Sequence, residues 1–174
     1  PVAEMAALGL RKVVEFQDLA YGAAYLGRVE AVLARDQAPF ELARQAAKYI
    51  ANAMAYDDVI RVADLKTRAG RAERIAAEMG ARAGNVVQLT EFLHPRAEEI
   101  VGLLPAKLGA RLEASPVWMA RLDRWFNKGR RLRSDSLRAF LMLHFLGGLR
   151  GYRRKTLRHA QEMVRQRARR PRHR

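Results

Sequence analysis

The residues best suited to chemistry form a series of alternating charge: Asp57, Arg61, Asp64 and Arg68. Their spacing of three and four residues places the side chains along one strip of a helix, where opposite charges pair. Apolar residues flank this strip on both sides, so we expect a helix that packs on two sides with the charges at the seam. The series is predicted to be a structural ion-pair ladder, and catalysis by its carboxylates is the alternative.

The same predicted helix carries an apolar stripe beside the ladder: Leu42, Ala46, Tyr49, Ala53, Tyr56, Ile60 and Ala63. Steps of three and four residues are typical of a helix that turns one face to the core. A tyrosine on such a stripe can act as a general acid but more often packs, and we expect packing for Tyr56. The neighbouring Asp57 and Asp58 point about 100° apart on a helix, so they are not expected to share a ligand.

A second group of charged residues lies near the C-terminus: Arg150, Arg153, Arg154 and Lys155. Cations near a helix N-terminus can hold a phosphate or a carboxylate, which makes this group a candidate anion or partner site. The alternative is a solvated basic turn. The segment ends in Lys-Thr, but it lacks the glycine before the lysine and the preceding strand that a phosphate-binding loop requires.

The sequence contains no residue pattern that is typical of metal binding or of nucleophilic catalysis. Cysteine is absent, which excludes disulfides and cysteine-ligated zinc or iron–sulfur sites within it. The histidines are scattered without the spacing of metal ligands, and His144 is expected to be a core residue. No Gly-x-Ser-x-Gly motif occurs. The sequence therefore predicts no catalytic, cofactor-binding or metal-binding residue.

The net charge of +15 is concentrated in the last third of the chain. Residues 1–120 contain 15 basic and 15 acidic side chains, whereas residues 121–174 contain 18 basic and 3 acidic ones. Such a segment is expected to bind nucleic acid, an anionic membrane surface or an acidic protein. The basic helix predicted from Tyr152 could lie along a phosphate backbone. Residues 165–174 are expected to form a solvated, disordered tail.

The periodicity predicts an all-α fold, an irregular bundle of about six helices, because strand alternation and hairpin dipeptides are absent. The first two helices, over about 3–36 and 39–79, are predicted to form a long antiparallel hairpin over 3–79. A loop over 80–94 and smaller helices over 95–164 follow, the first two of them over about 96–104 and 107–113. A length of 174 residues favours a single helical domain over 1–164.

Two of the smaller helices are expected to contribute to the core. Trp118 and Trp125 lie on a predicted helix over 116–127 and are expected to be core aromatics. The next helix, from Leu137, is apolar nearly all round and is expected to be buried. Residues 129–133 between these helices are predicted to form a basic loop.

A cytoplasmic location without membrane insertion is expected. No apolar run approaches the roughly 20 residues that span a bilayer, and no signal peptide is visible. The chain begins Pro-Val-Ala-Glu without an initiator methionine, so it is expected to be a piece of a longer protein.

Three blocks of the sequence carry a resemblance. Residues 54–68 read Met-Ala-Tyr-Asp-Asp-Val-Ile-Arg-Val-Ala-Asp-Leu-Lys-Thr-Arg, residues 16–18 read Phe-Gln-Asp, and residues 90–95 read Thr-Glu-Phe-Leu-His-Pro. They resemble the C-terminal segment of indolepyruvate ferredoxin oxidoreductase beta-subunit-like proteins. That family has Tyr-Gln-Asp where this chain has residues 16–18, and Thr-Glu-Phe-Leu-Lys-Pro where it has residues 90–95. His94 replaces the usual lysine. Residues 150–162 are similar to a closing helix of that family, so the resemblance covers most of the chain in order.

The resemblance implies that this chain is part of an oxidoreductase. Enzymes of that family oxidatively decarboxylate aryl 2-oxoacids such as indolepyruvate to acyl-CoA, using thiamine diphosphate and iron–sulfur clusters, with ferredoxin as the acceptor. This chain has no cysteine and no Gly-Asp-Gly thiamine motif, so the resemblance implies no cofactor on this segment. It implies a non-catalytic helical domain that docks onto other domains or subunits of the complex and meets ferredoxin only indirectly.

Two alternatives to this reading remain open. One is a stand-alone basic helical module that binds nucleic acid or an acidic protein, and the other is an enzyme with a site of its own. The basic end of the chain favours the first alternative, because it replaces the acidic and aromatic end that is usual in the family the sequence resembles.

Overall fold

A computed structural model describes residues 1–82, 85 and 87–168 of the chain. Over these residues the chain forms ten α-helices, two short 3₁₀ turns and one two-stranded ribbon. The all-α helical bundle is thus confirmed, with more helices than the six predicted because both long helices are interrupted. The chain divides into two compact units. Unit 1 comprises Pro1–Asp57 with the segment from Val164 onward, and unit 2 comprises Asp58–Met163.

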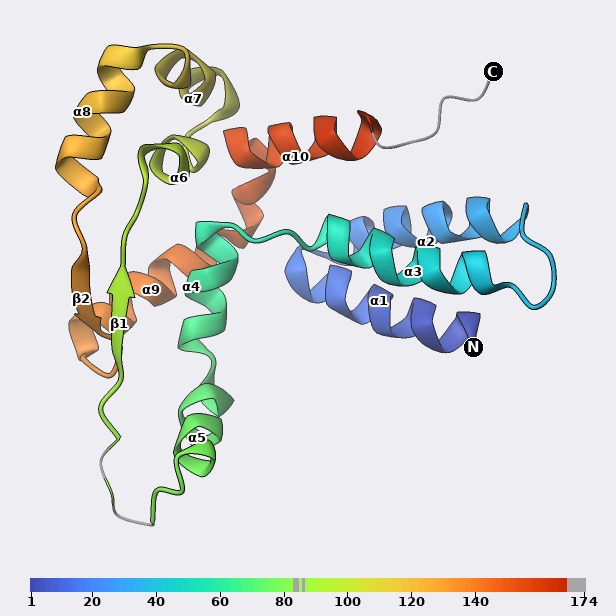
Figure 1. Ribbon diagram of the computed structural model, residues 1–174, viewed down its shortest axis with the longest axis horizontal. Helices are drawn as coiled ribbons and strands as arrows, with labels where there is room; N and C mark the ends of the chain where they lie inside the picture. Colours follow the sequence, from blue (N-terminus) through green and yellow to red (C-terminus); the bar gives the residue numbers. More distant parts are fainter. Residues whose placement is uncertain (83–84, 86, 169–174) are drawn as a thin grey trace. The chain divides into compact units, whose positions relative to one another are not determined.

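Unit 1 is built on three helices that pack closely (Figure 1): α1 (Val2–Phe16), α2 (Leu19–Leu33) and α3 (Glu41–Met54). The first two were expected to be one helix. They are separate because the Asp18 carboxylate accepts a hydrogen bond from the Tyr21 backbone N–H at 2.8 Å. This contact caps the N-terminus of α2, where the first N–H groups have no partner within the helix.

A small-residue face of α3 packs in the core of unit 1 against α1 and α2, which contribute Val13, Phe16 and Tyr25. Ala43, Ala47 and Ala51 are buried, whereas Leu42 and Tyr49 of the predicted stripe are exposed. The predicted stripe is therefore wrong for α3. Small side chains let neighbouring helices approach closely, and the Tyr25 hydroxyl, on α2, donates to the Ala47 carbonyl oxygen at 3.0 Å.

Unit 2 begins with α4 (Val59–Thr67) and α5 (Ala69–Glu78). The prediction of one continuous helix over 39–79 is wrong, so the helix hairpin ends at Met54, where α3 packed on α2 stops. Asp58 interrupts the predicted helix, because its carboxylate accepts from the Arg61 backbone N–H at 2.6 Å and caps α4. A second break lies at Arg68, whose backbone is extended.

Three short helices follow close to their predicted places: α6 (Ala97–Gly102), α7 (Ala106–Glu113) and α8 (Pro116–Phe126). Strand β1 (Thr90–Leu93) precedes these helices in the chain, and β2 (Arg130–Arg133) follows them. The two strands pair antiparallel, and Phe92 lies opposite Arg131. The predictions of a loop over 80–94 and a basic loop over 129–133 are thus wrong in part. Four-residue strands are too short for an alternating pattern to identify them.

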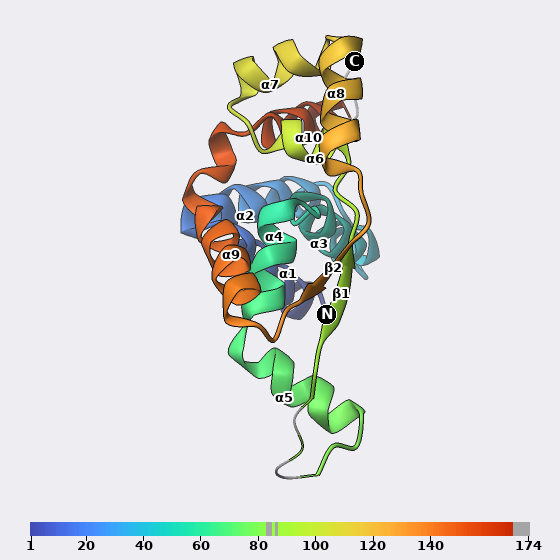
Figure 2. The ribbon, with the colours of Figure 1, turned by 90° about the vertical axis from the view of Figure 1, so that its left-hand side faces the viewer.

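The chain continues with α9 (Leu137–Gly148), the 3₁₀ turns η1 (Leu149–Gly151) and η2 (Arg153–Lys155), and α10 (Leu157–Ala168). Helices α4 and α9 lie side by side in both ribbon views (Figures 1 and 2). Residues 165–168 belong to α10 rather than to a disordered tail, and residues 169–174 lie outside the described part. None of the described helices has the length and apolar character needed to cross a membrane.

Candidate functional site

A buried ion pair joins the start of α4 to the turn η2. The Arg153 guanidinium Nε lies 2.7 Å from Asp58 Oδ2, and the two side chains are only 1% and 5% exposed. The same Asp58 carboxylate caps α4 through the Arg61 backbone N–H. Burying two charges is costly unless both are paired and hydrogen-bonded, so this contact constrains the positions of α4 and η2.

Thr156 and His159 stand beside this ion pair. The Thr156 hydroxyl donates to the Arg153 carbonyl oxygen at 2.7 Å and accepts from the His159 backbone N–H at 3.2 Å, which starts α10. Burial lowers the pKa of the His159 imidazole, and the positive charges of Arg154 and Arg153 lower that pKa further, against the opposite effect of Asp58. These effects favour the neutral form of the imidazole.

Acidification is expected to destabilise the chain through His159. Because the folded-state pKa lies below that of the unfolded chain, the unfolded state binds more protons as the pH falls below about 6.5. His159→Gln should therefore lose less stability than the wild type between pH 7.5 and 5.5, by at most about 1.4 kcal/mol per pH unit. Urea unfolding at several pH values measures this difference. Parallel pH profiles for the two proteins would contradict it.

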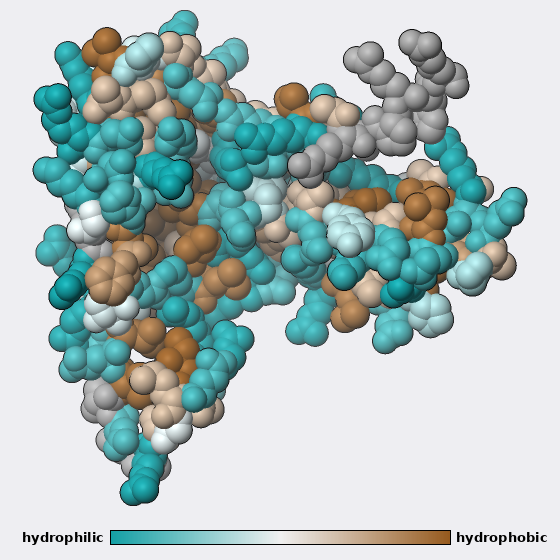
Figure 3. Space-filling view, in the orientation of Figure 1, coloured by the Kyte–Doolittle hydropathy of each residue, from teal (hydrophilic) through white to brown (hydrophobic). Residues whose placement is uncertain are grey.

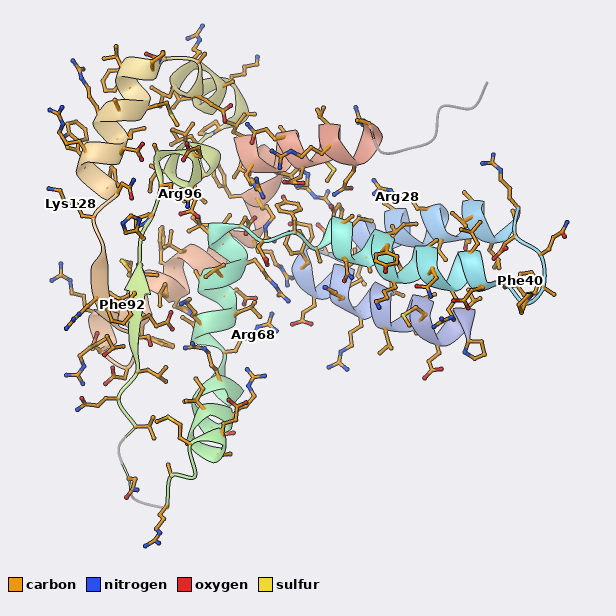
Figure 4. The ribbon with its side chains drawn as sticks, in the orientation of Figure 1. Arg28, Phe40, Arg68, Phe92, Arg96 and Lys128 are labelled. Atoms are coloured by element: carbon orange, nitrogen blue, oxygen red, sulfur yellow. The ribbon has the colours of Figure 1, made fainter. Side chains whose placement is uncertain are left out.

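The predicted charge ladder is present in part. Asp64 Oδ2 lies 3.2 Å from Arg61 Nη1 and 2.6 Å from Arg68 Nη2, so three of its four members meet. Arg68 lies at the junction of α4 and α5 (Figure 4). Asp57 is exposed and precedes the helix, because Asp58 is its cap. The ladder therefore comprises Arg61, Asp64 and Arg68, whereas Asp58 caps α4 and pairs with Arg153.

Helices α4 and α9 cross with their backbones in close approach. An ideal Cβ built on Gly147 would lie 2.9 Å from Asp64 Cα and 3.0 Å from Asp64 N. A hollow of about 270 Å³ opens at this crossing, lined by Asp64, Thr67, His144, Gly147, Gly148 and Arg150. His144 is exposed there and stacks on Phe140, with the ring centroids 5.7 Å apart, so its predicted place in the core is wrong.

The structure does not bring together the four predicted anion-binding residues. Arg153 is buried against Asp58, Arg150 lines the hollow, and Arg154 and Lys155 are exposed on η2. The prediction of one shared anion site is therefore wrong. The reason is that one arginine of the basic run balances a buried carboxylate that lies 95 residues earlier in the chain.

A second ion-pair group ties β1 to α4 and α5, and the sequence did not predict it. The largely buried Glu91 carboxylate contacts the Lys66 ammonium, and its Oε1 lies 2.9 Å from Arg71 Nη2. Burial, followed by the charge of Arg71, lowers the pKa of Lys66. One carboxylate thus faces two cations, and the strand is held against both helices.

The most unusual feature of unit 2 is the exposure of α9. Only Ala139 and Leu143 of this helix are buried, whereas Leu137 and Phe145 are 73% and 70% exposed. Leu141 and Met142 are exposed as well. The prediction that this helix is buried is wrong. Large apolar side chains that are contiguous and exposed mark an interaction surface, whereas scattered ones do not.

Helix α8 shows the same disagreement with the sequence. Trp118 and Trp125 are exposed and not core aromatics, and Arg121 lies over the Trp118 ring, 5.1 Å from its centroid. The face of unit 2 that carries β1 and β2 mixes hydrophobic and hydrophilic side chains (Figure 3). The hydrophobic pattern located these residues on helices but could not distinguish a core face from an interaction surface.

Within the described ranges, no three histidine or acidic side chains converge to hold a metal ion. The chain also has no cysteine, so it has no thiolate to offer an iron–sulfur cluster. The features that the structure does show in unit 2 are buried ion pairs between its elements and apolar side chains of α8 and α9 that face outward.

Comparison with known proteins gives one match. A family model described as a family of unknown function (DUF6537) matches residues 2–168. No curated protein and no solved structure is detectably similar to the chain.

Proposed function

Because the chain belongs to the DUF6537 family of unknown function, we propose a role for it from its surface and its sequence blocks. We propose that it is a non-catalytic helical docking domain of a 2-oxoacid ferredoxin oxidoreductase beta-like chain that acts on an aryl 2-oxoacid such as indolepyruvate. Its surface contacts the domains or subunits that carry thiamine diphosphate and iron–sulfur clusters. The location of the assembly is cytoplasmic.

The single observation that carries the docking role is the outward apolar face of α9. Leu137, Leu141 and Phe145 occupy positions i, i+4 and i+8, so they line up along one side of the helix. All three are more than half exposed. An amphipathic helix that turns such a row outward fits a hydrophobic groove on a partner, which is a common mode of helix recognition.

The identity of the partner rests on the sequence blocks at 16–18, 54–68 and 90–95. All three blocks contain structural contacts, among them the ion pairs of Glu91 with Lys66 and Arg71, and this supports an architectural role for the domain. Asp18 caps α2, and Asp58 both caps α4 and pairs with Arg153. The proposal assigns no catalytic residue to this chain, and ferredoxin meets the assembly elsewhere.

The test uses the complete protein that contains this chain, together with its partner subunits. Leu141→Glu with Phe145→Glu is expected to weaken assembly by at least tenfold and to lower arylpyruvate-dependent ferredoxin reduction in parallel, because two charges would be buried at the contact. Co-purification and size-exclusion chromatography measure the assembly, and the reduction rate of ferredoxin measures the activity.

Leu19→Glu on α2 is the matched control. Leu19 is 79% exposed, so its replacement adds charge to another apolar surface position without touching α9. It should leave assembly and turnover unchanged. The proposal is wrong if the α9 variant assembles normally, or if deletion of residues 1–174 leaves arylpyruvate-dependent ferredoxin reduction intact.

A further inference from the structure

We infer that unit 2 carries a binding surface for single-stranded nucleic acid, formed by α8 and the β1–β2 ribbon. We call it the aromatic–basic surface, and it consists of Phe92, Trp118, Arg121, Arg124, Trp125, Lys128 and Arg131. It is separate from the apolar row of α9, so the inference does not depend on the proposed oxidoreductase role.

Helix α8 presents two rings and two cations outward, and the exposed Lys128 follows the end of the helix. Trp118, Arg121 and Trp125 are spaced by three and four residues, which places them along one flank of the helix, with both rings exposed. Arg124 and Lys128 lie on the neighbouring exposed strip. The opposite side of α8 packs inward, and there the Asp123 carboxylate accepts from the Ala97 backbone N–H at 3.0 Å.

The ribbon extends this pattern beyond the end of α8. Phe92 and Arg131 are opposite each other in the register, on the exposed face of the ribbon, and the Arg131 guanidinium lies 5.5 Å from the Phe92 ring centroid. Phe92 is 74% exposed. Lys128 is exposed and lies in the short segment that joins α8 to β2 (Figure 4).

The acidic groups near this surface are engaged elsewhere. Asp123 caps α6, Asp135 pairs with Arg133 at 2.7 Å, and Glu91 faces Lys66 and Arg71 from the other face of the ribbon. The surface therefore has four cations, and the three nearby carboxylates named above already have partners. A polyanion is the ligand that such a charge distribution attracts.

The aromatic rings decide which polyanion fits. In single-stranded nucleic acid the bases are free to stack on exposed rings while the phosphates contact the cations, and this combination is the usual basis of its recognition. An acidic protein could pair with the cations, but it has no row of bases to stack on the exposed rings. The alternation of rings and cations thus favours a single strand over an acidic protein.

The two tryptophans of the chain both lie on this surface, which provides a direct readout. Titration of the full chain with a labelled oligo(dT) should raise its anisotropy and quench the intrinsic tryptophan fluorescence, because bases stack on the rings. Replacing Trp125 or Phe92 by Ala should weaken binding by about fivefold or more. Four phosphate contacts predict a slope of log K against log salt concentration of about −3.

Arg124→Ala with Arg131→Ala should reduce that slope by about 1.4. Lys107→Ala with Arg111→Ala, on the exposed side of α7, is the charge-matched control and should leave both slope and quenching unchanged. Circular dichroism confirms that each variant is folded. Three results would overturn the inference: binding without tryptophan quenching, equal loss of affinity in the α7 control, or equally tight binding of poly-glutamate, which would indicate an acidic protein partner.

Discussion

Replacing Arg153 by Met lowers the free energy of unfolding by about 3–5 kcal/mol, because it leaves the Asp58 carboxylate charged and buried without its partner. Methionine fills much of the space of the arginine stem, so the loss reports the missing charge more than a cavity. Urea unfolding followed by circular dichroism measures the change.

Lys155→Met is the matched control for this prediction. Lys155 lies two residues away on the same turn, carries the same charge and is exposed. Its replacement should change stability by no more than about 0.5 kcal/mol. A similar loss in both variants would mean that removal of any positive charge from this turn lowers the stability, and that the buried pair has no special role.

Asp58 has two tasks, and two substitutions separate them. Asparagine is as good an N-cap as aspartate, so Asp58→Asn removes the negative charge but keeps the cap of α4. Asp58→Ala removes both and should cost about 1 kcal/mol more. In the double variant Asp58→Asn with Arg153→Met, part of the loss should be recovered, because no unpaired charge stays buried. Strict additivity of the two single losses would show that the residues do not interact.

The fold class and the short helices of unit 2 were predictable, because local signals define them. The Pro at the first position of α8 and the periodic apolar residues identify that helix without any knowledge of its neighbours. The breaks at Asp18 and Asp58 were missed, since each aspartate stands inside an uninterrupted helical pattern. The signal was present nevertheless: aspartate favours the N-cap and disfavours the helix interior.

Contacts between distant residues were beyond local reasoning. The Asp58–Arg153 pair joins residues 95 positions apart, and no spacing rule links them. For the same reason Arg153 was grouped with its exposed neighbours as a candidate anion ligand. The exposed faces of α8 and α9 were not predicted, for a different reason. An apolar side chain has the same pattern whether it faces a core or a binding partner, so burial has to be observed.

The second large effect is expected at Gly147, where α4 and α9 meet. A Cβ at this position would approach the Asp64 Cα and N atoms to within 2.9 and 3.0 Å. These are backbone atoms of a packed helix that cannot turn aside as a side chain would. Gly147→Ala is therefore expected to cost about 1–3 kcal/mol through overpacking, despite alanine's better helix propensity, and Gly147→Val more.

Gly148, the next residue, provides the control. Nothing lies within 4 Å of its ideal Cβ, and its backbone is in the right-handed helical region. Gly148→Ala should thus stabilise the chain by about 0.4–1 kcal/mol, because it lowers the conformational entropy of the unfolded state. Opposite signs for adjacent glycine-to-alanine changes cannot arise from helix propensity alone, so they isolate the α4–α9 crossing. If both changes stabilise the chain, the helices do not approach as closely as 2.9 Å implies. The hollow beside Asp64 would then lie between helices whose separation is not fixed.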